Sequence, residues 1–227
     1  MNQIVHTPNP VLLVGGGACN PAQLALALTQ YSIVVAADGG AARVMAAGHM
    51  PEAVYGDMDS LAPELQADLA PGVLRHIAEQ DSTDFDKALR HIESPLIVGF
   101  GFLGARLDHQ LAAMTVLVRR ADRRCVLLGD DDIVFLAPPQ LSLDLPVGTR
   151  FSLFPFRQVT GRSAGLRWPI EGLAFGPDTQ IGTSNETIGP VELAFDQPGM
   201  LVILSIEVAD QVLMQLAAAR GWPRARE

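Results

Sequence analysis

The chain has 227 residues, of which 48% are hydrophobic and 18% charged, and its formal net charge is −9. This composition is typical of a globular protein with a well-buried core, and the acidic balance argues against a nucleic-acid surface, which needs clustered Lys and Arg. No apolar stretch approaches the roughly 20 residues that span a bilayer, and no basic segment with a long apolar run begins the chain, so we expect a cytoplasmic protein without membrane contact.

Up to about residue 136, apolar runs of strand length alternate with segments of helical period. The runs are Val11–Val14, Ile33–Ala37, Leu96–Phe100 and Cys125–Leu128. Continuous apolar strands separated by helices indicate a parallel sheet that is covered on both faces. Asn20 and Pro21 are a good N-cap and first residue for a helix through Leu28. We therefore predict an α/β fold with an N-terminal Rossmann-like lobe over residues 1–136.

After Pro138 and Pro139 the helical period largely disappears, and short apolar runs are punctuated by Gly and Pro. The candidate strands are Leu141–Leu145, Phe151–Phe154, Leu166–Ile170, Val191–Phe195 and Leu201–Ile206. This pattern predicts a C-terminal all-β sandwich or barrel lobe over residues 137–227, and residues 209–220 suit a terminal helix.

Two further features have structural explanations. Cys19 and Cys125 are far apart and form no metal-binding motif, so we expect them to be buried and reduced. Four arginines follow an apolar helical stretch, and we expect them to be its solvated C-terminal end. They are Arg119, Arg120, Arg123 and Arg124.

The first motif with chemical potential is Gly56-Asp57-Met58-Asp59-Ser60, which follows the apolar run Ala53–Tyr55. In an extended chain, residues i and i+2 project to the same face, so Asp57 and Asp59 can present two carboxylates to one cation. Such hard oxygen ligands suit Mg²⁺. A turn or a helix cap is the more common reason for an isolated Asp-x-Asp pair.

The second motif, residues 80–87, precedes a helix whose apolar face is formed by Phe85, Ala88, Leu89 and Ile92. Ser82 or Thr83 is the expected N-cap, which puts Asp84 and Lys87 near the first turn. Acidic residues in this place also have a structural explanation, because they complement the helix dipole.

Lys87 is the only lysine among 16 basic residues. Arginine serves elsewhere in the chain, so solubility alone does not explain this residue. A compact ammonium near a helix N-terminus suits a nucleotide phosphate, although one occurrence is also compatible with chance.

The third motif, residues 99–109, runs from a buried strand through a glycine-bearing turn into a helix. Gly101 and Gly104 permit close approach of the backbone to phosphate, and Arg106 supplies a fork for its oxygens. We expect His109 to position a group or to be solvated, in preference to acting as a base. The motif is not a Walker loop.

Two further glycine segments, residues 15–17 and 37–40, each follow a strand, where nucleotides dock in parallel sheets. Neither matches the dinucleotide-binding fingerprint. Asp38 suits a cap, or an acceptor for a ribose hydroxyl or a metal-bound water.

Carboxylates that converge with Lys87 and Arg106 would repel phosphates unless a divalent ion neutralised them, so the set predicts Mg²⁺ between the protein and a nucleotide.

Together these motifs resemble one family. ADGGA at 37–41, GDMDS at 56–60, DSTDFDKAL at 81–89, GxxGARLDH at 101–109 and GTSNE at 182–186 occur in the order found in thiamin pyrophosphokinases. Each piece is common, but the ordered set is specific and extends from about residue 10 to 206. The resemblance implies Mg²⁺-dependent transfer of pyrophosphate from ATP to thiamin, giving thiamin diphosphate and AMP.

The resemblance also implies a homodimer with shared active sites, in which ATP binds the first lobe and thiamin binds between subunits. It assigns magnesium and phosphate binding to four aspartates, and it brings Arg106 and Asp108 to the reacting groups. The four aspartates are Asp57, Asp59, Asp81 and Asp84. Lys87, singled out above for a phosphate, is expected to act with them in catalysis. The implied ATP-binding residues are Asp38, Gly39, Gly40, Thr83, Lys87, Gly101, Gly104, Arg106 and His109.

In the second lobe, the resemblance implies that Trp168 lies against thiamin and that Ser184 and Asn185 contact it. An indole can stack on this cation, and Ser or Asn can satisfy its ring nitrogens. The alternative for Trp168 is a core aromatic.

Two departures from the family pattern affect loop geometry: Ala105 replaces a frequent glycine, and Leu107 a frequent aromatic.

Two alternative functions remain. One is a pyrophosphokinase for another hydroxymethyl heterocycle such as a reduced pterin, and the other is a non-catalytic nucleotide- or thiamin-binding module. The GTSNE segment and Trp168 count against the first, and the intact set of charged residues counts against the second.

Overall fold

The computed structural model describes residues 4–104, 106–219 and 222. The fold is mixed α/β, as predicted, and the chain divides into two compact units. The first unit comprises Met1–Val116 and Leu127–Asp130, and the second comprises Leu117–Val126 and Asp131–Glu227. The domain boundary predicted between residues 136 and 137 stays a prediction.

The first unit contains parallel strands in the spatial order β7-β2-β3-β4-β5. These are β2 (Val11–Val14), β3 (Ile33–Ala37), β4 (Ala53–Gly56), β5 (Leu74–His76) and β7 (Ile97–Phe100). All residues of β2, β4 and β7 are buried, as expected for strands covered on both faces. A separate parallel pair joins β1 (Val5–His6) to β6 (Ile92–Glu93).

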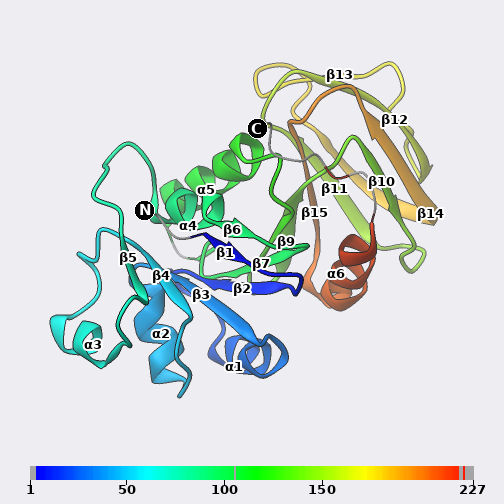
Figure 1. Cartoon of the computed structure of the whole chain (residues 1–227). Helices are drawn as coiled ribbons and strands as arrows, with labels where there is room; N and C mark the ends of the chain where they lie inside the picture. The colour runs from blue at the N-terminus through cyan, green and yellow to red at the C-terminus, as the bar shows by residue number, and fades with distance from the viewer. Residues whose placement is uncertain (1–3, 105, 220–221, 223–227) are drawn as a thin grey trace. The chain divides into compact units, whose positions relative to one another are not determined.

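Helices cover both faces of this sheet, with α1 and α2 on one face and α4 and α5 on the other (Figure 1). Their bounds are α1 (Pro21–Gln30), α2 (Gly40–Ala46), α3 (Pro63–Asp68), α4 (Asp84–Arg90) and α5 (Leu107–Arg119). Asn20 caps α1 through its Oδ1, and Thr83 caps α4 through its Oγ1, as predicted. The next strand of this sheet along the chain, β3, pairs with one edge of β2, whereas the later strand β7 pairs with its other edge. The strand order therefore reverses between β2 and β7, which opens a crevice at their carboxyl ends.

The second unit is largely antiparallel, with strands in the order β9-β15-β11-β14-β12-β13 and with β10 also paired to β14. The bounds are β9 (Asp132–Leu136), β10 (Gln140–Leu143), β11 (Arg150–Pro155), β12 (Val159–Leu166), β13 (Ala174–Phe175), β14 (Thr183–Phe195) and β15 (Met200–Ser205). The first part of β14 pairs with β11 and its last part with β10, so one long strand serves two sets of partners. A short 3₁₀ helix, η1 (Ile206–Val208), leads into α6 (Ala209–Ala218). β8 (Cys125–Leu128) crosses the division between the units.

Most strands that the apolar runs predict are present, but the prediction of a strand at Leu166–Ile170 is wrong. Only Leu166 belongs to a strand, the end of β12. The following residues are held by other bonds: Arg167 N donates to Glu186 O at 2.9 Å, and Trp168 N donates to the side chain of Asn185. Ile92 also leaves its predicted helix, because α4 ends at Arg90 and Ile92 lies in β6.

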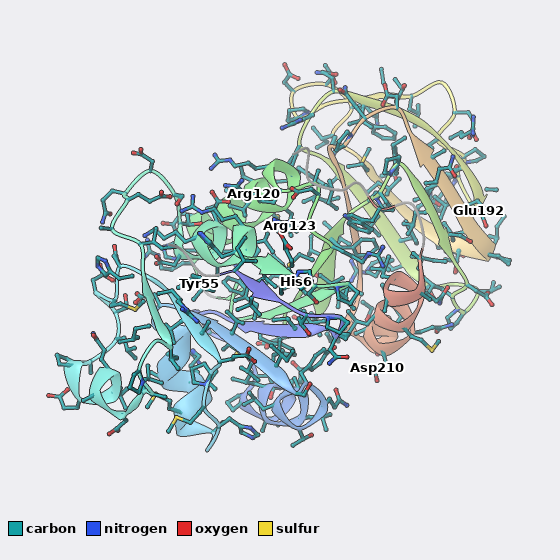
Figure 2. The ribbon with its side chains drawn as sticks, viewed as in Figure 1. His6, Tyr55, Arg120, Arg123, Glu192 and Asp210 are labelled. Carbon is teal, nitrogen blue, oxygen red and sulfur yellow. The ribbon has the colours of Figure 1, made fainter. Side chains whose placement is uncertain are left out.

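The arginine cluster near the end of α5, where Figure 2 labels Arg120 and Arg123, is less solvated than predicted. Arg124 is half-buried, donates to the carbonyl oxygens of Ala217 and Ala219 at 3.2 and 2.9 Å, and lies 5.2 Å from the centre of the Trp222 ring. It therefore satisfies the last carbonyls of α6, which have no partner within the helix.

Both cysteines are free, but Cys19 is only half-buried, which corrects the expectation that both are buried. Burial raises the pKa of both thiols.

Within the described part of the chain, none of the helices has the length and apolar character required to traverse a lipid bilayer.

Candidate active site

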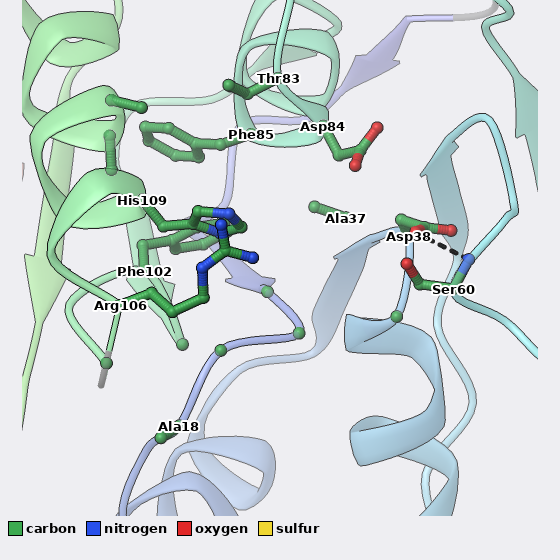
Figure 3. Close-up of a pocket in the computed structure, with 18 residues that line it drawn as sticks. Ala18, Ala37, Asp38, Ser60, Thr83, Asp84, Phe85, Phe102, Arg106 and His109 are labelled. Carbon is green, nitrogen blue, oxygen red and sulfur yellow. Dashed lines mark hydrogen bonds between the residues drawn. The ribbon is translucent and has the colours of Figure 1, made fainter.

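A pocket of about 640 Å³ opens where β2, β3 and β7 end. Arg106 and His109 lie on one side of it, and Asp38, Ser60 and Asp84 lie on the other (Figure 3). Glycine-bearing loops line the space between them. The volume is in the range of small-molecule sites, and the pocket lies at the reversal of strand order where such sites are expected.

Two glycine loops form one side of this pocket by packing backbone against backbone. Gly17 N donates to Gly101 O at 3.1 Å, and a Cβ atom on Gly17 would lie only 2.5 Å from the same oxygen. A Cβ atom on Gly104 would lie 2.5 Å from Ala18 O. Gly101 also has a φ of 78°, which favours glycine. Side chains would therefore separate the loops, so the glycines are required for their close approach.

Three carboxylates gather beside the pocket, from Asp38, Asp57 and Asp59. One oxygen of each lies within 4.8 Å of the others. Asp57 and Asp59 do not meet by projecting from an extended strand, as the sequence suggested, because β4 ends at Gly56 and Met58 has a φ of 66°. A left-handed turn at Met58 brings the two carboxylates together.

Met58 is also an anchor for this turn. Its side chain is buried in a cluster with Val54 and Leu61. Burial of a side chain of this size contributes roughly 1.5–3 kcal/mol, enough to offset the order of 1 kcal/mol that a non-glycine residue costs in the left-handed region. The apolar core thus holds the acidic turn in its conformation.

Asp38 is the buried member of the carboxylate group, with 3% of its surface exposed and a φ of 42°. Ser60 N donates to its Oδ2 at 3.2 Å, whereas no protein group among the described residues bonds to its buried Oδ1. Burial raises the pKa of Asp38, and the nearby Asp84 and Asp59 raise it further. An orphaned oxygen in a group of carboxylates fits a hard divalent cation such as Mg²⁺.

Lys87 opposes this negative charge from α4. Its side chain is 2% exposed, and its Nζ donates to Asp84 Oδ1 at 3.0 Å and lies 3.9 Å from Asp57 Oδ2. Gln80 Nε2 donates to the same oxygen of Asp57 at 3.1 Å, and this bond is the main reason that the pKa of Asp57 is low. Asp57 is therefore held as a carboxylate by an amide and an ammonium.

Arg106 and Asp108 form an exposed pair at the start of α5. Arg106 Nε and Nη2 donate to the two oxygens of Asp108 at 3.2 and 2.6 Å, which holds the pKa of Asp108 below its usual range. Leu107 between them is 67% exposed. Ala105, predicted to affect this loop, lies outside the described residues.

In the second unit, the segment after β12 is joined to β14 through Asn185. The Asn185 side chain is buried; its Oδ1 accepts from Trp168 N at 3.1 Å, and its Nδ2 donates to Trp168 O at 2.6 Å. The Trp168 side chain is 55% exposed, so it is not a core aromatic. Ser184 is also exposed, on β14.

Comparison with known proteins identifies the family. A sequence model described as the catalytic domain of thiamin pyrophosphokinase matches residues 24–128. Thiamine pyrophosphokinase 1 of Oryza sativa subsp. japonica is 31% identical over 185 residues, covering 66% of this chain and 70% of that protein. The chain belongs to the thiamin pyrophosphokinase family. The resemblance seen in the motifs is confirmed, and neither rival interpretation is favoured.

Solved structures of thiamin pyrophosphokinases share the fold. That from Geobacillus thermodenitrificans is 24% identical with a TM-score of 0.70, covering 86% of this chain and 97% of that one. That from Candida albicans is only 14% identical but has a TM-score of 0.72, covering 90% and 97%. At these identities the likeness concerns the fold alone.

Within this thiamin pyrophosphokinase fold, most predicted site residues of the first unit come together. Several line the pocket: Asp38, Gly39, Thr83, Asp84, Gly101, Gly104, Arg106 and His109. Asp57 and Asp59 adjoin Asp38, whereas Asp81 is exposed and lies outside this carboxylate group. Gly40 packs under β2, since a Cβ atom there would lie 2.0 Å from Val14 O. Their assignments to ATP and metal stay predictions.

Sequence reasoning missed two contributors to this site. Gln80 orients Asp57, and Ser60 binds Asp38. Asp38 was expected to contact a nucleotide or a metal-bound water, and the structure places it in the carboxylate group with Asp57 and Asp59. The signal for Gln80 and Ser60 was available, because each is a residue of a motif, but nothing local indicates which carboxylate each contacts.

Proposed function

We propose that this chain transfers the pyrophosphoryl group of ATP to the hydroxyethyl oxygen of thiamin, with release of AMP, and that ATP occupies the pocket of the first unit. One observation supports this most directly: a carboxylate group with an orphaned buried oxygen faces Arg106 across a glycine-lined pocket, in a member of the thiamin pyrophosphokinase family. Pyrophosphoryl transfer needs this combination of positioning and charge stabilisation.

The nucleotide is proposed to lie along the glycine loops. Gly17 and Gly101 line the pocket without a Cβ atom, so phosphates could approach their backbone closely. Arg106 offers a planar fork for phosphate oxygens from the opposite side. This guanidinium is paired with Asp108, so we expect phosphates to compete with that carboxylate for it.

Magnesium is proposed to bind the carboxylates of Asp38, Asp57 and Asp59, with Asp84 and Asp81 as further ligands, directly or through water. Bound Mg²⁺ would neutralise phosphate charge and polarise the transferred group. Lys87 pairs with Asp84 and lies near Asp57, so it would hold both carboxylates in place, and Gln80 fixes the oxygen that Asp57 presents. Asp38 keeps one oxygen for a ligand because Ser60 occupies the other.

Thiamin is proposed to bind the second unit. Trp168 offers an exposed indole face to the cation, and Ser184 offers a hydroxyl. Asn185 supports this surface by holding the backbone of Trp168 on both sides, and its remaining N–H can contact the ligand. We further propose a homodimer in which these residues complete the site of the partner's first unit.

The same proposal includes the finer description of each unit. Parallel order and a reversal between β2 and β7 support a Rossmann-like lobe, and the division of β14 between two sets of partners supports a sandwich. Free cysteines agree with a cytoplasmic protein, and a net charge of −9 agrees with small-molecule substrates in place of nucleic acid.

The test of function is the identity of the second product. Incubation with ATP, Mg²⁺ and thiamin is expected to release AMP in step with thiamin diphosphate, because the β-phosphorus is the one attacked. Chromatography of the nucleotides and thiamin esters measures this. ADP formed together with thiamin monophosphate would contradict the proposal, as would transfer to a reduced pterin but not to thiamin.

Replacing Trp168 by alanine is expected to weaken thiamin binding by about 0.5–2 kcal/mol, because the cation–π contact is lost. Affinity for ATP should hardly change, since no residue of the pocket is altered. Calorimetric titration with each substrate measures both effects. Phe154→Ala is a matched control, because Phe154 is also an exposed aromatic side chain of the second unit.

Mixed subunits test the shared site. Trp168→Ala and Asp57→Asn protomers are each expected to be impaired, but a heterodimer should regain one intact composite site. Activity of the exchanged mixture should therefore exceed the sum of the parents. If it does not, despite demonstrated subunit exchange, each site is built within one chain.

A further inference from the structure

One carboxylate, that of Glu79, holds the segment between β5 and α4. Its Oε1 accepts from Arg90 Nη1 at 2.8 Å and from Ser82 Oγ at 2.5 Å. Arg90 is the last residue of α4, and Ser82 directly precedes the cap of that helix. Glu79 therefore ties this segment to both ends of α4.

The segment that Glu79 holds carries groups of the acidic site. It begins at Ile77, which is buried and whose N–H donates to Gly56 O at 2.8 Å, and it ends at the N-cap Thr83. Between these anchors, Gln80 reaches Asp57 Oδ2 and Asp81 is exposed. The side chains of residues 78–80 are themselves exposed, so burial does not fix this stretch.

We propose that Glu79 and Arg90 are positioning residues for pyrophosphoryl transfer. Their ion pair keeps residues 78–82 folded over α4, so that Gln80 holds Asp57 toward its neighbouring carboxylates. The inference rests on the proposed function for its chemistry but concerns residues that do not line the pocket. Partners of metal-binding carboxylates commonly tune metal affinity in this way.

An ordinary surface ion pair makes a different prediction. The side chains of Glu79 and Arg90 are 40% and 23% exposed, and such pairs contribute little to stability. A pair that mattered only for stability would leave metal affinity unchanged. A positioning pair changes metal affinity and local protection while the melting temperature hardly moves.

Glu79→Gln keeps the size of the side chain and removes its charge. In the full chain, titration of the metal-free protein with Mg²⁺ is expected to show about tenfold weaker binding. Amide hydrogen exchange of a peptide covering residues 78–82, measured without metal or nucleotide, should become faster. The melting temperature should fall by no more than about 2 °C.

Asp132→Asn is the matched control. It removes the Arg150–Asp132 pair of the second unit, whose side chains are 45% and 43% exposed. Magnesium affinity and exchange at 78–82 should keep their wild-type values in this variant. The double variant Glu79→Arg with Arg90→Glu restores an ion pair with opposite polarity, and it should recover part of the lost Mg²⁺ affinity.

Wild-type Mg²⁺ affinity and wild-type exchange in Glu79→Gln would overturn the inference, as would an equal loss of Mg²⁺ affinity in Asp132→Asn. The outcome is separable from that of the proposed function. If the unaltered chain makes no thiamin diphosphate, the function fails, while titration and exchange still decide whether the pair positions the acidic site.

Discussion

Asp57→Asn should reduce the rate of thiamin diphosphate formation by at least about 100-fold at saturating substrates. Asp57 adjoins Asp38 and Asp59, and its carboxylate is kept ionised by Gln80 and Lys87. Asparagine has nearly the same shape but carries no charge, so a cation loses one of its ligands while the fold persists. Asp84→Asn should act in the same direction, because it removes the nearest partner of Lys87.

Three measurements complete this test. Steady-state rates are compared with those of Asp68→Asn, which alters an exposed carboxylate at the end of α3. Circular dichroism checks the fold of each variant. A chelator should abolish turnover of the unaltered chain, and added Mg²⁺ should restore it. Near-normal turnover of Asp57→Asn at saturating Mg²⁺ would remove that residue from the site.

Lys87→Met should lower both stability and activity. The ammonium is almost completely buried between Asp84 and Asp57, and methionine fills a similar volume without charge. Loss of one partner from a buried charge group costs about 3–5 kcal/mol, and because Asp84 and Asp57 remain partly solvated we expect about 1–3 kcal/mol. Repulsion between the remaining carboxylates should also distort the proposed metal site and reduce turnover.

Urea unfolding and steady-state kinetics measure the two effects of Lys87→Met. In the double variant with Asp84→Asn, the stability loss should be smaller than the sum of the single losses, because one uncompensated charge is gone. Lys87→Arg keeps the charge, but its planar head does not fit a site closed around an ammonium, so it should recover little activity. An unchanged unfolding free energy in Lys87→Met would show that the ion pairs of Lys87 with Asp84 and Asp57 contribute nothing to stability.

The sequence alone indicated the central strands of the first unit. Val11–Val14 and Ile33–Ala37 were predicted at their observed bounds, because strands covered on both faces must be continuously apolar. It was less informative in the second unit, where β12 contains Gly161 and Gly165 and alternating polar residues. Pairing with β14, some 30 residues later in the chain, stabilises this strand, and no local sequence pattern indicates that β14 is its partner.

The ordered motifs also identified the family, because they record which chemical groups the site needs. They could not establish how these groups meet. The turn at Met58 depends on an apolar cluster that forms only in the folded chain, and the composition that singled out Lys87 does not reveal that it lies between two carboxylates. Likewise, the motif assigned Asn185 to the ligand, but in the folded chain the oxygen and the nitrogen of its side-chain amide both bond to the backbone of Trp168. Residue types follow from the chemistry and are visible in sequence, whereas burial, pairing and orphaned atoms arise from contacts between distant segments, which only the tertiary structure decides.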